Sequence, residues 1–170
     1  MNSSITTTNY YKTNRDTRNK ILRRFSMFDG VGLDLTSASS FDEALNMAGL
    51  DYSAKKVSLY LSNRQKLDNA FAVVKSDNPS QVLGVVGNQY HAVSNRDAFA
   101  VAEDIVNKGY ATYEVGGPSM KSQRALDYAK SFLVLKGDDF QIEDDIFNSF
   151  VVFNNSFDGS TGVQYLIFTT

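Results

Sequence analysis

The sequence predicts an α+β fold: a single domain with a largely antiparallel sheet, two or three helices packed on it and a polar N-terminal arm. Three observations predict it. The chain has 170 residues, enough for one sizeable core and too few for two ordinary domains. Hydrophobic residues make up 42% of it and only 2 residues are Pro, as is typical of a globular protein. Short apolar runs separated by turn residues outnumber the segments with helical periodicity.

The N-terminal part of the chain differs from the rest in polarity. Residues 1–13 are polar and without periodicity, and we expect them to form an arm that lies on the protein's own body or on a neighbour. From residue 14 on, apolar residues recur at helical spacing and predict an amphipathic helix over residues 14–28. Its apolar residues are Ile21, Leu22, Phe25 and Phe28.

This N-terminal part is also strongly basic. Residues 1–27 carry six cations and one anion, although the net charge of the whole chain is −2. A basic segment on a nearly neutral body is typical of a surface that binds phosphate backbones, and the alternative is a solvated helix face. The six cations are Lys12, Arg15, Arg18, Lys20, Arg23 and Arg24.

Residues 138–145 show the opposite charge, with five carboxylates and no cation. Carboxylate oxygens are the ligands that Ca²⁺ prefers, but the glycine-containing loop motif that bends a chain around this ion is missing. The segment is therefore predicted to be a solvated loop.

Two further helices are predicted from their capping residues. Ser40 and Glu43 form a capping box at the start of a helix that ends at Gly49. Asn95 is the predicted N-cap of a longer helix that Gly109 closes.

Strands are predicted wherever short apolar runs stand between turn residues. The turn at residues 77–80 joins two of them into a hairpin, and residues 154–162 form a long connection between the last two. Residues 121–130 fit either a strand or a helix. The predicted strands are 57–61, 70–74, 82–86, 110–115, 132–135, 150–153 and 163–168, and residues 116–118 are predicted to end the fourth of them.

Several kinds of chemistry are excluded by composition. The chain has 0 Cys and 1 His, so thiolate metal sites, cysteine nucleophiles and multi-histidine sites are absent. No glycine-rich phosphate loop occurs, and we expect no cofactor and no enzymatic activity. The lone His91 has no partner that the sequence identifies, and Glu114, Asp127 and Lys130 are only a weak candidate for a metal-dependent nuclease. No apolar run is long enough for a membrane span.

Five segments in succession resemble a known family. They read A-G-L-D-Y (48–52), L-G-V-V-G-N-Q-Y (83–90), V-S-N-R-D-A-F (93–99), Y-E-V-G-G (113–117) and N-S-F-D-G-S (155–160). Their order and spacing over residues 41–170 resemble the phage- and plasmid-encoded proteins known as domain of unknown function 932.

The sequence departs from this family at three places. Tyr52 stands where the family usually has Trp, and Phe157 stands where it has His. The family also continues beyond the last strand, so we expect this chain to be a natural short form or a truncated one. The resemblance implies a mobile-element protein, found in the host cytoplasm or in the virion, and it brings no catalytic residue to this sequence.

Two functions of different classes fit these observations. The first is binding of single-stranded nucleic acid in recombination or replication, although a pI near 5.3 is low for a dedicated binder. The second is an assembly role, in which the arm and the basic helix dock on another copy, a virion component or a host factor, and in which the last strand can pair across chains. For the first function, the predicted contact residues are Arg15, Arg18, Lys20, Arg23 and Arg24 for phosphates and Tyr10, Tyr11 or Tyr90 for bases.

Overall fold

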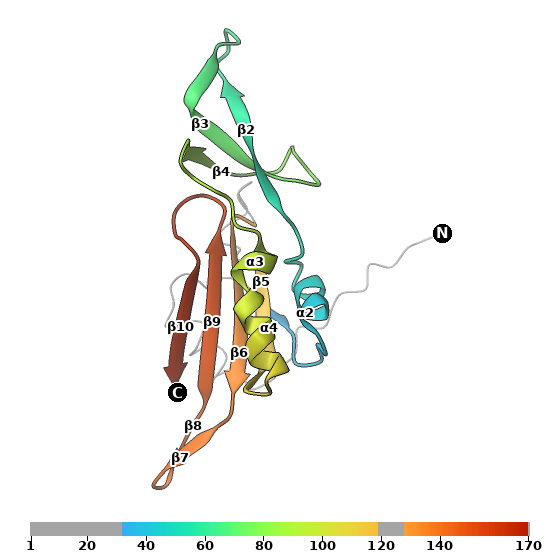
Figure 1. Cartoon of the computed structure of the whole chain (residues 1–170), viewed down its shortest axis with the longest axis vertical. Coiled ribbons are helices and arrows are strands. Elements are labelled where there is room, and N and C mark those ends of the chain that lie inside the picture. Colours follow the sequence, from blue (N-terminus) through green and yellow to red (C-terminus); the bar gives the residue numbers. More distant parts are fainter. Residues whose placement is uncertain (1–31, 119–127, 170) are drawn as a thin grey trace, which may run out of the picture.

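The computed structural model describes residues 32–118 and 128–169, which form three antiparallel sheets and three short helices (Figure 1). The largest sheet has five strands in the order β1-β5-β6-β9-β10, the second has the order β2-β3-β4, and β7 and β8 form a two-stranded hairpin. The α+β prediction is confirmed in its antiparallel strands, but the helices are a minor part and the strands form two main sheets rather than one. The strands are β1 Leu33–Asp34, β2 Ala54–Tyr60, β3 Lys66–Lys75, β4 Val82–Gly87, β5 Ala111–Pro118, β6 Lys130–Gly137, β7 Phe140–Ile142, β8 Asp145–Phe147, β9 Ser149–Ser156 and β10 Gln164–Thr169.

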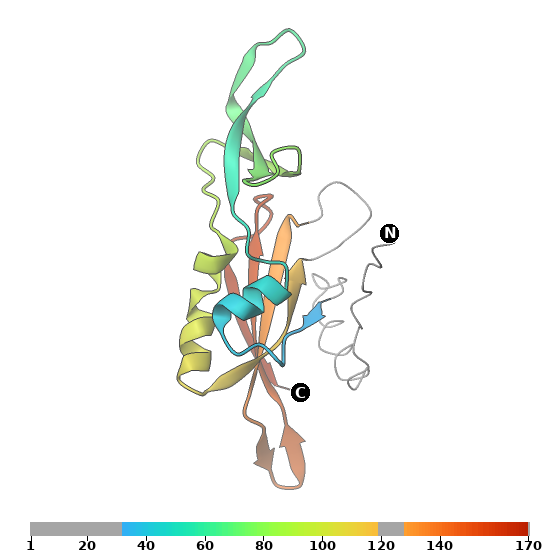
Figure 2. The ribbon, with the colours of Figure 1, turned by 90° about the vertical axis from the view of Figure 1, so that its right-hand side faces the viewer.

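The helices all lie on one face of the five-stranded sheet (Figure 2). Leu45 from the first helix and Phe99 from the turn between the other two pack with Leu133 and Phe153 from the sheet, and all four are completely or almost completely buried. Burial of such a side chain stabilises the fold by about 1.5–3 kcal/mol. The helices are α2 Phe41–Met47, α3 Asn95–Ala98 and α4 Ala100–Asn107.

The five-stranded sheet is apolar on its second face as well. Val115, Phe132, Val134, Phe150 and Val152 form a separate buried cluster there. Because β6 and β9 are buried on both faces, they appear in the sequence as continuous apolar runs rather than as alternating ones.

The capping of α2 agrees with the prediction in one of its two bonds. The Ser40 hydroxyl accepts a hydrogen bond from the Glu43 amide (3.2 Å), as expected. The Glu43 carboxylate, however, accepts from the amide and hydroxyl of Ser39 (2.8 and 2.7 Å) rather than from Ser40. These two bonds hold the pKa of Glu43 below its ordinary value. The positive φ of Gly49 (66°) confirms the predicted end of this helix.

The prediction that Asn95 caps the next helix is wrong. Ser94 is the N-cap, and its hydroxyl accepts from the Asp97 amide (3.0 Å). Asn95 is completely buried in the first turn instead. The predicted long helix is also interrupted at Phe99, which separates α3 from α4. Gly109 closes α4 with a φ of 74°, as expected.

Two strand predictions are corrected by tertiary contacts. Strand β5 continues through Gly116, Gly117 and Pro118 instead of ending there, because Gly116 leaves space for Leu35: a Cβ at this glycine would lie 2.9 Å from Leu35 Cδ1. Residues 138–145 do not form a loop but belong to the β7–β8 hairpin, which is exposed as expected for its charge. The short strand β1, which no pattern in the sequence predicted, pairs with β5.

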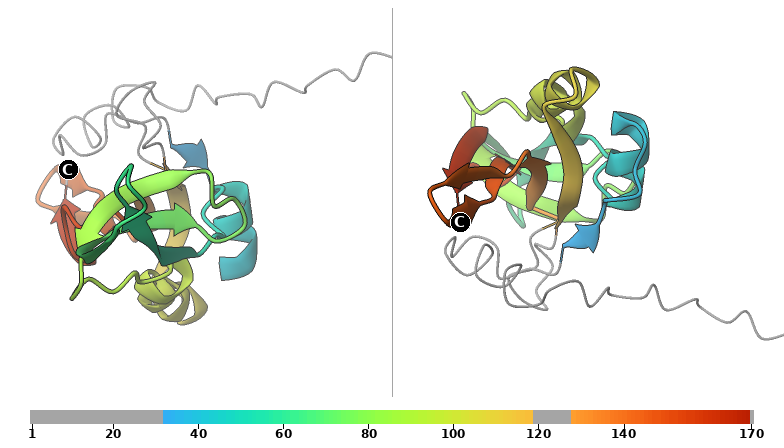
Figure 3. Two further views of the ribbon diagram at one scale, coloured as in Figure 1. Left: turned by 90° about the horizontal axis from the view of Figure 1, so that it is seen from above. Right: turned by 90° about the horizontal axis from the view of Figure 1, so that it is seen from below.

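The molecule is elongated, with the three-stranded sheet at one end and the β7–β8 hairpin at the other (Figure 1). The views along the long axis show these two ends in front of the five-stranded sheet, one in each view (Figure 3). The β2–β3 hairpin and the β7–β8 hairpin therefore project in opposite directions.

Candidate nucleic-acid interface

The β2–β3 hairpin is the most basic part of the described chain. Residues 54–67, here called the basic hairpin, contain four cations and no carboxylate. Lys55, Arg64 and Lys66 are exposed and form no ion pair within the described ranges. The first carboxylate after the hairpin is Asp68. Free cations on a projecting element are available to an external anion.

The tip of the basic hairpin is a tight turn. The Arg64 amide donates to the Leu61 carbonyl (2.8 Å), and the Leu61 amide donates to the Gln65 carbonyl (2.8 Å). Asn63 supports the turn by accepting from the Gln65 amide (3.0 Å). Arg64 has a φ of 67°, in the left-handed region that usually takes glycine. The backbone thus places an arginine side chain at a position where its conformation is costly.

An aromatic ring and a cation lie side by side behind this turn. Tyr60 and Lys66 are directly opposite each other in the β2–β3 register, so their side chains share one face. The Tyr60 side chain is 62% exposed, and Leu61 next to it is 46% exposed. A ring that can stack on a base beside an ammonium that can neutralise a phosphate is the combination found in single-strand binding surfaces.

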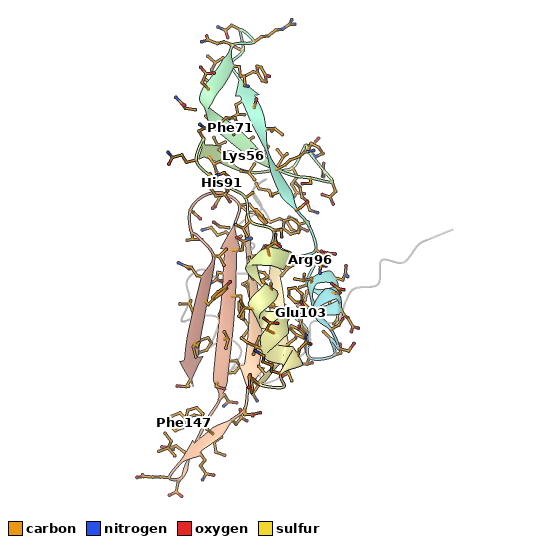
Figure 4. All side chains as sticks on the ribbon, in the orientation of Figure 1. Lys56, Phe71, His91, Arg96, Glu103 and Phe147 are labelled. Carbon is orange, nitrogen blue, oxygen red and sulfur yellow. The ribbon has the colours of Figure 1, made fainter. Side chains whose placement is uncertain are left out.

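The fourth cation of the hairpin has a structural role. Lys56 Nζ donates to the Asn88 carbonyl (2.7 Å) and lies 4.9 Å from the centre of the Phe71 ring (Figure 4). This side chain is therefore engaged within the three-stranded sheet. The cations free to bind a ligand are Lys55, Arg64 and Lys66.

The residues that the sequence predicted for nucleic-acid binding are not brought together in the described part of the chain. Tyr10, Tyr11, Arg15, Arg18, Lys20, Arg23 and Arg24 lie outside the described residues, as do the predicted arm and basic helix. Tyr90 is described: it is half-buried rather than exposed, and its hydroxyl donates to the Ser156 carbonyl (2.8 Å). Burial, together with the negative charge of Asp158, raises the pKa of Tyr90.

The described structure gives no support to a metal-dependent nuclease site. Glu114 lies in β5 and Lys130 begins β6, while Asp127 lies outside the described residues. Within the part of the chain that the structure describes, no three His, Asp or Glu side chains are grouped so as to hold a metal ion. His91 is exposed between β4 and α3 (Figure 4).

Four of the five segments that carry the family resemblance (48–52, 83–90, 93–99 and 155–160) contact one another between the two main sheets, at what is here called the junction. The Tyr52 hydroxyl donates to the Tyr128 carbonyl (2.6 Å) and lies 3.0 Å from Ser131 Oγ. Burial raises the pKa of Tyr52. Arg96 joins α3 to the start of α2 and to the loop after it, through ion pairs with Asp42 and Asp51.

Two asparagines complete this junction. Asn95 Nδ2 donates to the Leu50 carbonyl (3.1 Å), and Asn155 Nδ2 donates to both Asn95 Oδ1 (3.0 Å) and the Val93 carbonyl (2.9 Å). Both side chains are buried. Sequence reasoning assigned Asn95 to a cap and missed this network, because a capping asparagine and a buried one look alike in a sequence.

The connection between β9 and β10 packs against strand β4 of the three-stranded sheet. A Cβ at Gly84 would lie only 2.5 Å from the Cα of Asp158, so β4 and this connection approach each other at backbone distance. A glycine within a strand permits a close backbone approach of this kind. Phe157, which replaces the family's usual His, is completely buried in the core beside this contact.

The fold is that of an α+β protein with two main antiparallel sheets, which lie end to end and are joined by these contacts. The sequence matches the family described as a domain of unknown function (DUF932) over residues 82–170, and the chain belongs to this family. No curated protein and no solved structure matches it. No helix among residues 32–118 and 128–169 is long and apolar enough to cross a membrane.

Proposed function

We propose that the protein is a non-enzymatic nucleic-acid-binding protein that holds single-stranded DNA on the basic hairpin. The observation that carries the proposal is the exposed Tyr60 beside Lys66 at the tip of a hairpin with no carboxylate. Phosphate neutralisation by Lys and Arg supplies most of the affinity of such proteins, and stacking adds about 1–3 kcal/mol per base.

The N-terminal basic segment is the second part of this proposal. Its five predicted phosphate ligands would add to the cations that the hairpin offers to a nucleic acid. The resemblance to phage- and plasmid-encoded proteins favours a role in recombination or replication of a mobile element, in the host cytoplasm or in the virion.

Binding is tested with a fluorescent single-stranded oligonucleotide, by anisotropy at about 50 and about 200 mM salt. We expect affinity that falls steeply with salt, because counterions are released when phosphates are neutralised. Lys66→Glu should weaken binding on the order of tenfold. The matched control is Lys108→Glu, which makes the same change in net charge at an exposed position after α4.

Three outcomes decide between the possibilities. Equal losses in Lys66→Glu and Lys108→Glu would mean that only net charge matters, and would overturn the assignment to the hairpin. A loss confined to the Arg23→Glu, Arg24→Glu double variant would move the site to the N-terminal segment. No binding by the wild type at low salt would overturn nucleic-acid binding altogether.

The alternative function is an assembly module without affinity for nucleic acid. The exposed and uncharged edge strand β10 favours it, since such edges pair readily with other strands. This function predicts a multimer in light scattering that becomes smaller when residues 1–13 are removed, and no oligonucleotide signal.

A further inference from the structure

The second projecting element is the β7–β8 hairpin, which is the electrostatic opposite of the basic hairpin. Residues 138–147, here called the acidic hairpin, carry five carboxylates and no cation. We infer that the acidic hairpin of one molecule docks on the basic hairpin of a second copy, so that molecules associate head to tail. This interaction goes beyond the proposed function and does not require nucleic acid.

The acidic hairpin lacks packing partners of its own in the described structure. Its strands have only three residues each and pair with each other alone. The rings of Phe140 and Phe147 stack at 5.4 Å between centroids, but Ile142 is 57% exposed and Ile146 is 66% exposed. An isolated two-stranded hairpin is marginally stable in water, so a partner that covers these side chains would stabilise it.

Most carboxylates of the acidic hairpin form no ion pair within the described residues. Asp139 pairs with Lys136 at the base of the hairpin (3.3 Å). Glu143, Asp144 and Asp145 at its far end form no ion pair within residues 32–118 and 128–169. Their side chains are exposed, so a cationic partner can reach them.

The basic hairpin supplies the complementary surface. It offers the unpaired cations Arg64 and Lys66 near the exposed apolar side chains of Tyr60 and Leu61, and Lys55 at the other end of β2. Each hairpin thus combines one sign of charge with exposed apolar groups, and each has what the other lacks. Charge complementarity of this kind selects partners and steers their encounter.

The position of the two hairpins decides the geometry of association. They lie at opposite ends of the long axis (Figure 1), so a molecule cannot bring its own two hairpins together. The contact is heterologous, and repetition of it gives an open chain or, if the rotation closes, a ring. Because nucleic acid and the acidic hairpin would use the same cations, DNA should compete with association.

The test is sedimentation velocity of the full chain and of two charge-reversed variants at about 50 mM salt. One variant carries Arg64→Glu with Lys66→Glu, and the other carries Asp144→Lys with Asp145→Lys. As its concentration rises, we expect the wild type to form species of two or more times the monomer mass. Each variant alone should remain monomeric. An equimolar mixture of the two variants should associate again, because each one retains the hairpin that the other has lost.

The control is Glu103→Lys with Asp104→Lys, which reverses two adjacent exposed carboxylates on α4. It should associate as the wild type does. A wild type that stays monomeric, variants that still associate alone, or a mixture that does not associate would each overturn the inference. Association of both variants alone would instead indicate pairing of β10 edges.

The same variants separate this inference from the proposed function. The Asp144→Lys, Asp145→Lys variant keeps the basic hairpin and should still bind the oligonucleotide. If the wild type associates but binds no oligonucleotide, the proposed function fails and head-to-tail association stands. If the wild type binds the oligonucleotide but stays monomeric at all concentrations, head-to-tail association fails and the proposed function stands.

Discussion

Arg64 and Glu143 occupy the tips of two hairpins at opposite ends of the molecule, and both have a positive φ, of 67° and 54°. Non-glycine residues are uncommon in this region, because Cβ approaches the following carbonyl oxygen. In each case the strained position holds a charged residue, and the charge has the sign of its own hairpin. The strain at the two tips supports the binding roles proposed for these side chains.

Replacement of Arg64 separates stability from binding. In Arg64→Gly, removal of the left-handed strain outweighs the greater flexibility of the unfolded chain, and the free energy of unfolding should rise by about 0.5–1 kcal/mol. If Arg64 contacts a phosphate, affinity for the oligonucleotide should fall and the salt slope should decrease by about 1. Thermal melting and anisotropy measure the two effects.

The control for this prediction is Arg64→Lys, which keeps both the charge and the strain. It should leave stability and salt slope close to those of the wild type. A glycine variant that is less stable than the wild type would show that the arginine side chain stabilises the turn.

The close approach at Gly84 predicts a sharp difference between two glycines of the same strand. Gly84→Ala forces Cβ against the backbone of Asp158, and should lower the free energy of unfolding by about 1–3 kcal/mol. Gly87→Ala is the matched control, because a Cβ there would meet nothing within 4 Å and its φ is not positive. Urea denaturation of both variants should show a loss in Gly84→Ala alone, and similar stability in the two would contradict the backbone contact.

Removal of the Asn95 side chain should destabilise the junction. In Asn95→Ala, one donor of Asn155 loses its partner in a buried site and the Leu50 carbonyl keeps only its bond from the Tyr52 amide, which costs about 1–3 kcal/mol. Asn88→Ala, at an exposed position, is the control and should change stability by less than about 0.5 kcal/mol. Had Asn95 served only as a helix cap, Asn95→Ser would retain full stability, whereas a role in the junction predicts a loss in that variant as well.

Alkaline pH should unfold the protein partly through Tyr113. Burial, assisted by the negative charge of Glu103, raises the pKa of this residue from its ordinary value of 10.0 to about 12. Between these pH values the unfolded chain releases the Tyr113 proton and the folded chain keeps it, so stability is complete below pH 10 and falls as pH rises toward 12.

Thermal melting between pH 9 and 12 checks this prediction in two single variants. Tyr113→Phe should show a shallower loss of stability with pH than the wild type, since the titrating group is gone. Tyr110→Phe, at a side chain that is 67% exposed, should keep the slope of the wild type. Equal slopes in the two variants would assign the alkaline effect to other groups.

Local patterns in the sequence determined much of the fold. The capping serine of α2, the glycines that end α2 and α4, and the turn between β3 and β4 act over a few residues, so the chain alone is enough to find them. The apolar runs 132–135 in β6 and 150–153 in β9 were equally plain, because a strand that is buried on both faces has consecutive rather than alternating apolar residues. The motifs from Ala48 onward also pointed to the family.

Tertiary structure decided the rest, because the contacts concerned join residues far apart in the chain. No local signal distinguishes a capping Asn95 from one bonded to Asn155, or a Gly116 that ends a strand from one that makes space for Leu35. In the same way, the sequence did not indicate a basic surface at residues 54–67, because the three lysines and the arginine are dispersed along it. They became a candidate surface only when the β2–β3 hairpin carried them, with Tyr60, away from the body of the protein.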